Sequence, residues 1–302
     1  MEERHITYSS CPCCGSSALS KALVATDYLV SEKEFEIWEC ADCTLRFTQN
    51  VPDYNSISQY YQSGNYISHS GTNKGLINRL YHFVRKITLS DKRRLILSVT
   101  QMDNGRLLDI GAGTGSFVSH MQSNGWKATG LEPDEAARSN ALAINGVNLL
   151  TPDAFFDFPA DSFDVITMWH VLEHVHELHD YMEQLKKILS PGGKIFIAVP
   201  NYTSYDAGFY KNFWAAYDVP RHLYHFSPEA MFQLLKIHNL QLLATRVMWY
   251  DSFYISLLSE KYKKKKKNPV RGFFVALISN LKAFVDKEQC SSLIYVIGDN
   301  NQ

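Results

Sequence analysis

Hydrophobic and polar positions follow two alternating patterns from about residue 93 onwards. Short apolar runs predict buried strands at 106–111, 127–133, 147–150, 163–171, 194–201, 240–250 and 292–299. Segments with helical periodicity predict helices at 116–125, 134–146, 178–189 and 227–239. Ser227 and Pro228 are the expected N-cap and first residue of the last helix. The alternation predicts an α/β fold with a mostly parallel sheet and helices on both faces.

The chain before residue 93 predicts two further parts. Residues 1–52 contain short β-like pieces and most of the cysteines, and residues 53–92 are rich in Tyr, Ser, Asn and Gly before an amphipathic stretch. We therefore divide the chain into a small β module (1–52), a helical and aromatic lid and linker (53–92), and the α/β domain (93–302). An insert is expected in this domain at about 253–290.

Composition narrows the class of protein. The 302 residues are 45% apolar and can bury a sizeable core. Thirty basic residues against 31 acidic ones leave a net charge of -1, so no nucleic-acid partner is expected. No apolar run reaches the roughly 18 residues of a membrane span, and the N-terminus lacks the apolar segment of a signal peptide. A cytoplasmic location with reduced thiols is therefore expected.

The cysteines cluster near the N-terminus. Cys11-x-x-Cys14 and Cys40-x-x-Cys43 each present two thiolates, and two such turns complete a closed four-sulfur zinc site. Because no coordination position stays open, the role of this zinc would be structural. Cys13 is expected to be a spectator, and a group of buried thiols without metal is the alternative.

The segment LLDIGAGTGSF (107–117) carries the most specific chemical signal. A buried strand runs into three alternating glycines, and such a turn lets a ligand approach main-chain N–H groups. Glu132 ends the second strand, where it can accept hydrogen bonds from ribose hydroxyls. A dinucleotide-binding oxidoreductase is the alternative, but its fingerprint requires glycine at Ser116. Asp109, before the loop, would also repel a pyrophosphate. The same carboxylate favours the sulfonium and ammonium of S-adenosylmethionine (SAM).

Together with GLEP (130–133), DSFDVITMWHVLEHV (161–175) and LSPGGKIFIAVPN (189–201), this loop resembles the motifs of class I SAM-dependent methyltransferases. The resemblance covers roughly residues 93–250 and is specific as a set. It implies a Rossmann-like sheet of seven strands. It also implies that the methionyl end of SAM is held by Asp109, Gly111, Ala112, Gly113 and Gly115.

The same resemblance assigns the rest of the cofactor site. Glu132 would bind the ribose, and Asp153 would lie near the adenine. Trp169 and His170 would line the cofactor and face the substrate.

A zinc ribbon ahead of such a domain is similar to the N-terminal part of sugar C-methyltransferases. The stretch Arg221-His222-Leu223-Tyr224-His225-Phe226-Ser227 resembles their Glu-His-Leu-x-Tyr-Phe-Ser motif, in which the histidine is the base. The resemblance assigns that role to His222, with His170 as a second candidate. Arg221 and His225 depart from the family's Glu and Tyr. The alternative is a histidine that fixes the loop to the next helix.

Two other segments suggest contacts. In related methyltransferases a segment like YYQSGNYISHSG (60–71) closes over SAM, so Tyr66 is expected near the cofactor; an interdomain linker is the alternative. The run Lys263–Lys267 is expected to be a solvated charge cluster. Its alternative is a contact with an anionic membrane or a lipid-linked substrate.

The sequence therefore predicts a SAM-dependent methyltransferase with a structural zinc. Its acceptor would be a small molecule, with a sugar or glycoconjugate hydroxyl or carbon as first choice. A nicotinamide-dependent oxidoreductase and a non-catalytic SAM-binding module are the alternatives. Nothing in the sequence indicates the oligomeric state.

Overall fold

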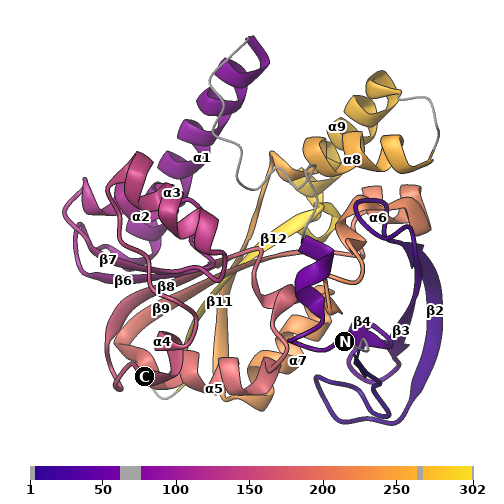
Figure 1. Ribbon diagram of the computed structural model, residues 1–302, viewed down its shortest axis with the longest axis horizontal. Helices are drawn as coiled ribbons and strands as arrows, with labels where there is room; N and C mark the ends of the chain where they lie inside the picture. The colour runs from indigo at the N-terminus through magenta and orange to yellow at the C-terminus, as the bar shows by residue number, and fades with distance from the viewer. Residues whose placement is uncertain (1–3, 62–75, 264–267, 301–302) are drawn as a thin grey trace. The chain divides into compact units, whose positions relative to one another are not determined.

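The structure is a computed structural model that describes residues 4–61, 76–263 and 268–300 (Figure 1). The chain forms two compact units. The first comprises residues 1–66, 170–182 and 197–297, and the second comprises residues 67–169, 183–196 and 298–302. The division proposed at residues 52 and 92 stays a prediction; residue 92 lies inside helix α1 (Leu76–Thr100).

The second unit contains the start of the predicted strand and helix alternation. Strand β6 (Arg106–Ile110) pairs in parallel with β7 (Lys127–Leu131) and with β8 (Phe163–Trp169). Their apolar residues are almost all buried, as expected for strands covered on both faces. Helices α2 (Ser116–Gln122) and α3 (Glu135–Asn145) lie on one face of these strands, and α4 (Ala154–Asp157) follows α3 (Figure 1).

The first unit contains most of the remaining elements. Those of its N-terminal stretch are β1 (His5–Ile6), β2 (Leu19–Thr26), β3 (Glu34–Cys40), β4 (Arg46–Thr48), β5 (Val51–Pro52) and η1 (Ile57–Tyr61). Those after β8 are η3 (Leu172–His174), α6 (Tyr205–Tyr210), η4 (Lys211–Phe213), η5 (Ala215–Tyr217), β10 (Tyr224–His225), α7 (Pro228–Ile237), β11 (Leu240–Val247), α8 (Asp251–Lys263), α9 (Pro269–Val285), η6 (Lys287–Gln289) and β12 (Ser292–Asp299). Helix α5 (Leu178–Ile188) and strand β9 (Leu189–Pro200) contribute residues to both units.

The large sheet has six strands among the described residues, in the order β11-β12-β9-β8-β6-β7. The expectation of seven strands is wrong at 147–150, which forms a single parallel bridge between Leu150 and Leu131. Two backbone hydrogen bonds flank that bridge, from Leu150 N to Gly130 O and from Glu132 N to Leu150 O. Pro152 follows and has no N–H to donate, so the ladder does not continue.

The N-terminal module includes one strand from far along the chain. Its four-stranded sheet has the order β10-β4-β3-β2, and Tyr224 and His225 of β10 pair antiparallel with Phe47 and Arg46. The segment that carries His222 is therefore anchored to the cysteine-containing module by strand pairing. Just beyond it, the predicted cap of α7 is confirmed, because the Ser227 hydroxyl accepts a hydrogen bond from Ala230 N.

The loop after β9 buries most of its large aromatic side chains in the core of the first unit. Trp214, Tyr210 and Tyr217 are buried, and Trp214 Nε1 donates to Asp206 at 2.8 Å. Tyr202 and Tyr217 also line an open groove beside β2. Among the described residues, no helix combines the length and apolar character needed to cross a bilayer.

Candidate functional site

The glycine turn after β6 has the backbone that its sequence predicts. Gly111, Gly113 and Gly115 all have positive φ, at 72°, 56° and 68°. At Gly115 an added Cβ would lie 3.0 Å from the Ala141 side chain, so helix α3 packs directly against the turn. At Gly113 an added Cβ would meet no atom within 4 Å. The backbone at Gly113 is thus open to a ligand, whereas Gly115 closes the turn onto α3.

Asp109 lies in β6 just before this turn and is buried. Its Oδ1 accepts a hydrogen bond of 2.6 Å from the hydroxyl of Thr167, its register partner on β8. Burial raises the pKa of Asp109 to about 6, against the opposing effects of that hydrogen bond and of Lys92. The carboxylate is therefore mainly ionised at neutral pH, and a cationic ligand would stabilise this ionised form.

Glu132 follows β7 and is directed back to the glycine turn. Its Oε2 accepts from Gly113 N at 2.7 Å and its Oε1 from Asp134 N at 3.0 Å. Ala112 N donates to Leu131 O at 2.8 Å, which ties the turn to the same strand end. The second unit thus gathers the two predicted acids and the glycine loop at one edge of the parallel strands.

Asp153 and Trp169 complete the part of the predicted site in the second unit. Asp153 is exposed, three residues after the Leu150 bridge to β7. Trp169 ends β8, where its ring packs edge-on against Phe117 and Lys92 Nζ lies 4.2 Å from its ring centroid. Trp169 Nε1 is buried without a hydrogen-bond partner among the residues that the structure describes. The open glycine, the two carboxylates and this indole N–H fit a ligand such as SAM, which has cationic groups and hydrogen-bonding groups.

His170 follows directly but belongs to the first unit. It has a positive φ of 58°, and its Nε2 lies 2.7 Å from Asp251 Oδ2. Its Nδ1 is 3.4 Å from Glu173 Oε1. Burial alone would lower the pKa of His170, but these two carboxylates outweigh it and raise the pKa to about 10. His170 is therefore a cation at neutral pH, and a protonated imidazole cannot accept a proton.

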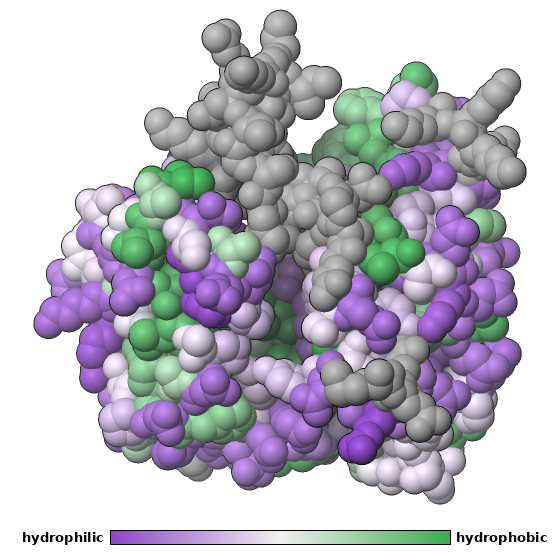
Figure 2. All heavy atoms as spheres, in the orientation of Figure 1, coloured by the Kyte–Doolittle hydropathy of each residue, from purple (hydrophilic) through white to green (hydrophobic). Residues whose placement is uncertain are grey.

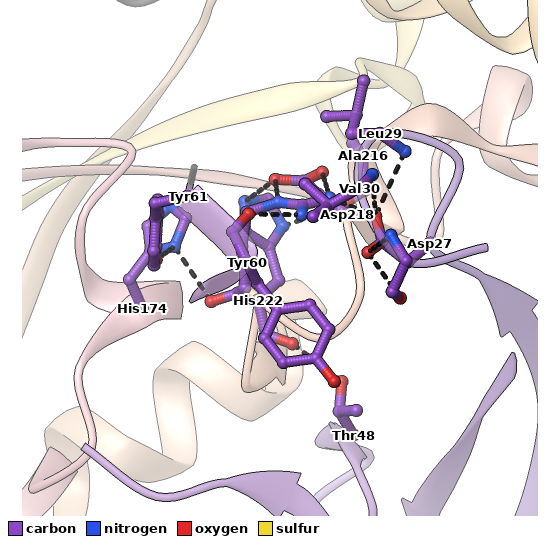
Figure 3. A network of polar contacts seen from close by, with 12 residues as sticks. Asp27, Leu29, Val30, Thr48, Tyr60, Tyr61, His174, Ala216, Asp218 and His222 are labelled. Atoms are coloured by element: carbon purple, nitrogen blue, oxygen red, sulfur yellow. Dashed lines mark hydrogen bonds and ion pairs between the residues drawn. The ribbon is translucent and has the colours of Figure 1, made fainter. Parts of the chain in front are cut away.

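His222 lies in a cluster of histidines within the first unit (Figure 3). Its Nδ1 is 2.9 Å from the carbonyl oxygen of Ala216, and its ring centroid is 4.5 Å from that of His174. Because a carbonyl only accepts, Nδ1 donates and Nε2 of the neutral ring carries the lone pair. Burial and the neighbouring His174 lower the pKa of His222 well below its usual value, so it is neutral at pH 7.

The imidazole of His174, like that of His222, has its Nδ1 close to a backbone carbonyl oxygen. Its Nδ1 lies 2.9 Å from Arg221 O and 3.0 Å from the hydroxyl of Tyr61. Glu173 is fully buried, and within the described part of the chain its carboxylate has an ion pair with His170 but no hydrogen bond. One ligand atom each from Glu173, His174 and His222 lies within 4.8 Å of the others. Such a group can hold a proton or a divalent cation.

Arg221, which replaces the Glu of the sugar methyltransferase motif, is a structural residue in this chain. It is 1% exposed and bridges two carboxylates, at 2.7 Å to Asp218 and 3.0 Å to Asp27. Both of these bonds come from Nη2, and Nη1 donates to Tyr60 O at 2.9 Å. The guanidinium fixes the loop before His222 to the N-terminal module. Asp218 in turn lies 4.0 Å from His222 Nε2.

The four predicted zinc ligands come together in two matching turns. Sγ of Cys11 is 3.5 Å from that of Cys43, and Sγ of Cys14 is 3.6 Å from that of Cys40. All four sulfurs lie within 4.8 Å of one another. The carbonyl of each first cysteine accepts a backbone bond from the residue after the second, Gly15 or Thr44, and both of these have positive φ. Tetrahedral zinc with Zn–S bonds of about 2.3 Å would separate the sulfurs by about 3.8 Å, so the cluster fits zinc.

Sequence reasoning missed several residues of the histidine cluster. Glu173 lies within the segment 161–175, yet only the structure brings it to His174 and His222. Nothing in the sequence except their charge indicated that Asp27 and Asp218 hold Arg221 beside His222. Tyr66, a predicted cofactor residue, lies outside the described residues. The assigned roles of all these site residues stay predictions.

Comparison with known proteins identifies the family. A family described as a methyltransferase domain matches residues 81–245, more than half of the chain. The ubiquinone biosynthesis O-methyltransferase of Erwinia tasmaniensis is 33% identical over 118 residues, which cover 35% of this chain and 48% of that protein. The enzyme of the same name from Vibrio cholerae is 34% identical over 104 residues, covering 32% and 42%. The matches span less than half of these relatives.

Solved structures with similarity to this chain include a SAM-dependent methyltransferase from Archaeoglobus fulgidus. Its TM-score is 0.49 at 19% identity, and the match covers 70% of this chain and 93% of that one. Phosphoethanolamine N-methyltransferase 2 of Haemonchus contortus, in complex with SAM, has a TM-score of 0.48 at 19% identity, with coverage of 69% and 52%. On the match over residues 81–245, this chain belongs to the methyltransferase-domain family.

Proposed function

We propose that the chain transfers a methyl group from SAM to a hydroxyl group of a small molecule. The observation that carries the proposal is the open glycine turn between two carboxylates, with Glu132 bonded to Gly113 N. When bound, SAM supplies a methyl group on a sulfonium, which a nucleophile displaces in line. Asp109 would balance the positive charge of the methionyl end, and Glu132 would accept from the ribose.

A hydroxyl acceptor requires a group that removes its proton. His222 is the proposed base because its ring is neutral and its Nε2 lone pair is free of the bond to Ala216. His170, the second candidate, is disfavoured by its raised pKa. As a cation it would instead stabilise negative charge on Glu173.

The chemical class of the acceptor has two candidates. The similarity to sugar C-methyltransferases favoured a sugar or glycoconjugate. The relatives matched here are named O-methyltransferases of ubiquinone biosynthesis, which favours a hydroxyl on an aromatic ring. We place this phenolic hydroxyl first and the sugar hydroxyl second.

Mass spectrometry of reactions with labelled SAM can decide this. Catechols and polyprenylated phenols should gain one methyl group, and a matched panel of nucleotide sugars should not. Methylation of sugars alone would reverse the order, and turnover with neither panel would remove the hydroxyl acceptor proposal.

Glu132 offers a direct test of the cofactor site. Glu132→Ala should weaken SAM binding by about 1–3 kcal/mol, as expected for the loss of charge-assisted hydrogen bonds. Glu132→Gln is the matched control, because its amide oxygen can still accept from Gly113 N. Calorimetry should place Gln between the parent and Ala. Equal affinity in all three proteins would remove Glu132 from the ribose site.

We also propose one structural zinc per chain, held by Cys11, Cys14, Cys40 and Cys43. Elemental analysis of protein purified without chelator should find one zinc, and Cys40→Ser should lose it with a lower melting temperature. Cys13→Ser is the control and should retain the metal, since Cys13 lies outside the four-sulfur group. Metal-free, folded parent protein would contradict this site.

A further inference from the structure

Helix α9 exposes its large apolar residues and buries its small and polar ones. The buried face includes Gly272, Ala276, Ser279, Asn280 and Ala283. The opposite face carries exposed apolar side chains. They are Val270, Phe273, Phe274, Ile278, Leu281, Phe284 and Val285, with exposures of 64%, 50%, 55%, 38%, 55%, 74% and 93%. Figure 2 shows hydrophobic side chains over the region of α9.

Specific contacts fix the helix in this orientation. Ser279 Oγ donates to Asp206 and lies 2.9 Å from Gln289 O, and Asn280 Nδ2 donates to Trp249 O at 2.8 Å. At Gly272 an added Cβ would lie 3.2 Å from side-chain atoms of α8. Rotation that buried the phenylalanines would break these bonds and lose this close packing. The apolar face is therefore a stable surface feature, of the kind that marks an interaction site.

Aromatic residues extend this face next to α9. Trp249 stacks on Phe284 with ring centroids 4.7 Å apart, and both Tyr250 and Tyr254 are exposed. Trp and Tyr are the side chains enriched where a bilayer meets water, because each combines an apolar ring with a polar group.

The charge beside this face is positive at one end. Helix α8 ends in Lys261 and Lys263. Lys264–Lys267, the rest of the run singled out in the sequence, lie outside the described residues. The acidic residue next to Lys261 in the sequence, Glu260, is 1% exposed, and its charge is neutralised by Arg271 at 2.6 Å. Asp286 and Glu288 follow the other end of α9.

We propose that the α9 face, defined by the seven exposed side chains above, binds the surface of an anionic lipid bilayer. An exposed apolar helix face next to lysines, here Lys261 and Lys263 of α8, is the arrangement of helices that lie in a membrane interface. A second copy of this chain is the competing occupant, because antiparallel pairing of two α9 faces would set the lysines of one copy beside Asp286 and Glu288 of the other. The bilayer is preferred because it also accounts for the exposed Trp249, Tyr250 and Tyr254. This inference is independent of the proposed acceptor.

Vesicle flotation tests the proposal with the full chain. We expect binding to vesicles of phosphatidylcholine with 30% phosphatidylglycerol, weakened by high salt, and little binding to phosphatidylcholine alone. Lys261→Gln with Lys263→Gln should raise the lipid concentration for half-binding about five-fold per lysine, the factor equivalent to about 1 kcal/mol. Lys127→Gln with Lys187→Gln, both exposed elsewhere, is the charge control and should bind as the parent does.

A second set of variants tests the apolar face. Leu281→Ser with Val285→Ser should reduce vesicle binding at least about ten-fold while SAM affinity and melting temperature stay near those of the parent. Leu142→Ser with Ile144→Ser is the matched control, since these residues are 58% and 64% exposed on α3. Absence of parent binding to anionic vesicles would overturn the proposal. So would light scattering that finds a dimer which the α9 variant converts to monomer.

Discussion

Gly113→Val is expected to abolish SAM binding and leave the fold intact. The branched side chain would fill the space that is open above Gly113, where a ligand would approach the backbone. It would also hold a β-branched residue at a φ of 56°, which costs about 1–2 kcal/mol. Gly125→Val is the matched control, because Gly125 also has positive φ and open space but lies outside the site. Calorimetry should find no SAM binding only for Gly113→Val.

Circular dichroism should show both variants folded, with similar melting temperatures. Equal SAM affinity in the two variants would move the cofactor away from this loop. Loss of binding in both would instead indicate that backbone strain, not lost space, is responsible.

Asp109 adds a pH dependence to the same binding event. Its pKa of about 6 means that the carboxylate is mainly ionised at pH 7 and mainly protonated at pH 5. SAM affinity should therefore fall about ten-fold between these pH values, since the neutral acid cannot offset a cationic ligand. Asp109→Asn should bind weakly at both values, with this pH dependence removed.

Local sequence patterns could predict the part of the site in the second unit. Asp109, the glycine loop and Glu132 lie within 24 residues of sequence, and one strand–turn–helix–strand unit brings them together. Repetition of that pattern also gives the parallel pairing of β6 with β7 and β8. The apolar pattern at 147–150 did not show that this segment forms only a single bridge, because that outcome depends on Pro152 ending the ladder.

The histidine cluster could not be predicted in the same way. His222 is positioned by Asp218 and Arg221, and Arg221 binds Asp27 from 194 residues earlier in the chain. Thr48 donates to the carbonyl of His222 at 2.7 Å, and strand β10 joins β4. Such contacts depend on pairing between segments remote in sequence, which no periodicity records. In the sequence, Arg221 was only a departure from the motif of the sugar methyltransferases. In the structure, its guanidinium holds the loop before His222 to Asp27 of the N-terminal module.

His222→Ala is expected to lower kcat by about 10²–10⁴, typical of losing a general base, with SAM affinity almost unchanged. The parent rate should be nearly constant from pH 8 to pH 6.5, because burial and His174 hold the pKa of His222 well below its usual value. A base acts in its deprotonated form, so the parent rate should fall only at more acidic pH. The variant should lose that fall.

His225→Asn is the control for a structural role. His225 is also buried, its pKa is lowered to about 3, and it lies next to His222, with Nε2 3.2 Å from Thr48 Oγ1. If His222 only supports the loop, both variants should lose melting temperature and activity together. If it is the base, His225→Asn should keep most of kcat and the pH profile of the parent. Full activity in His222→Ala would exclude it as the base and leave His174, whose ring lies beside it, as the group to test next.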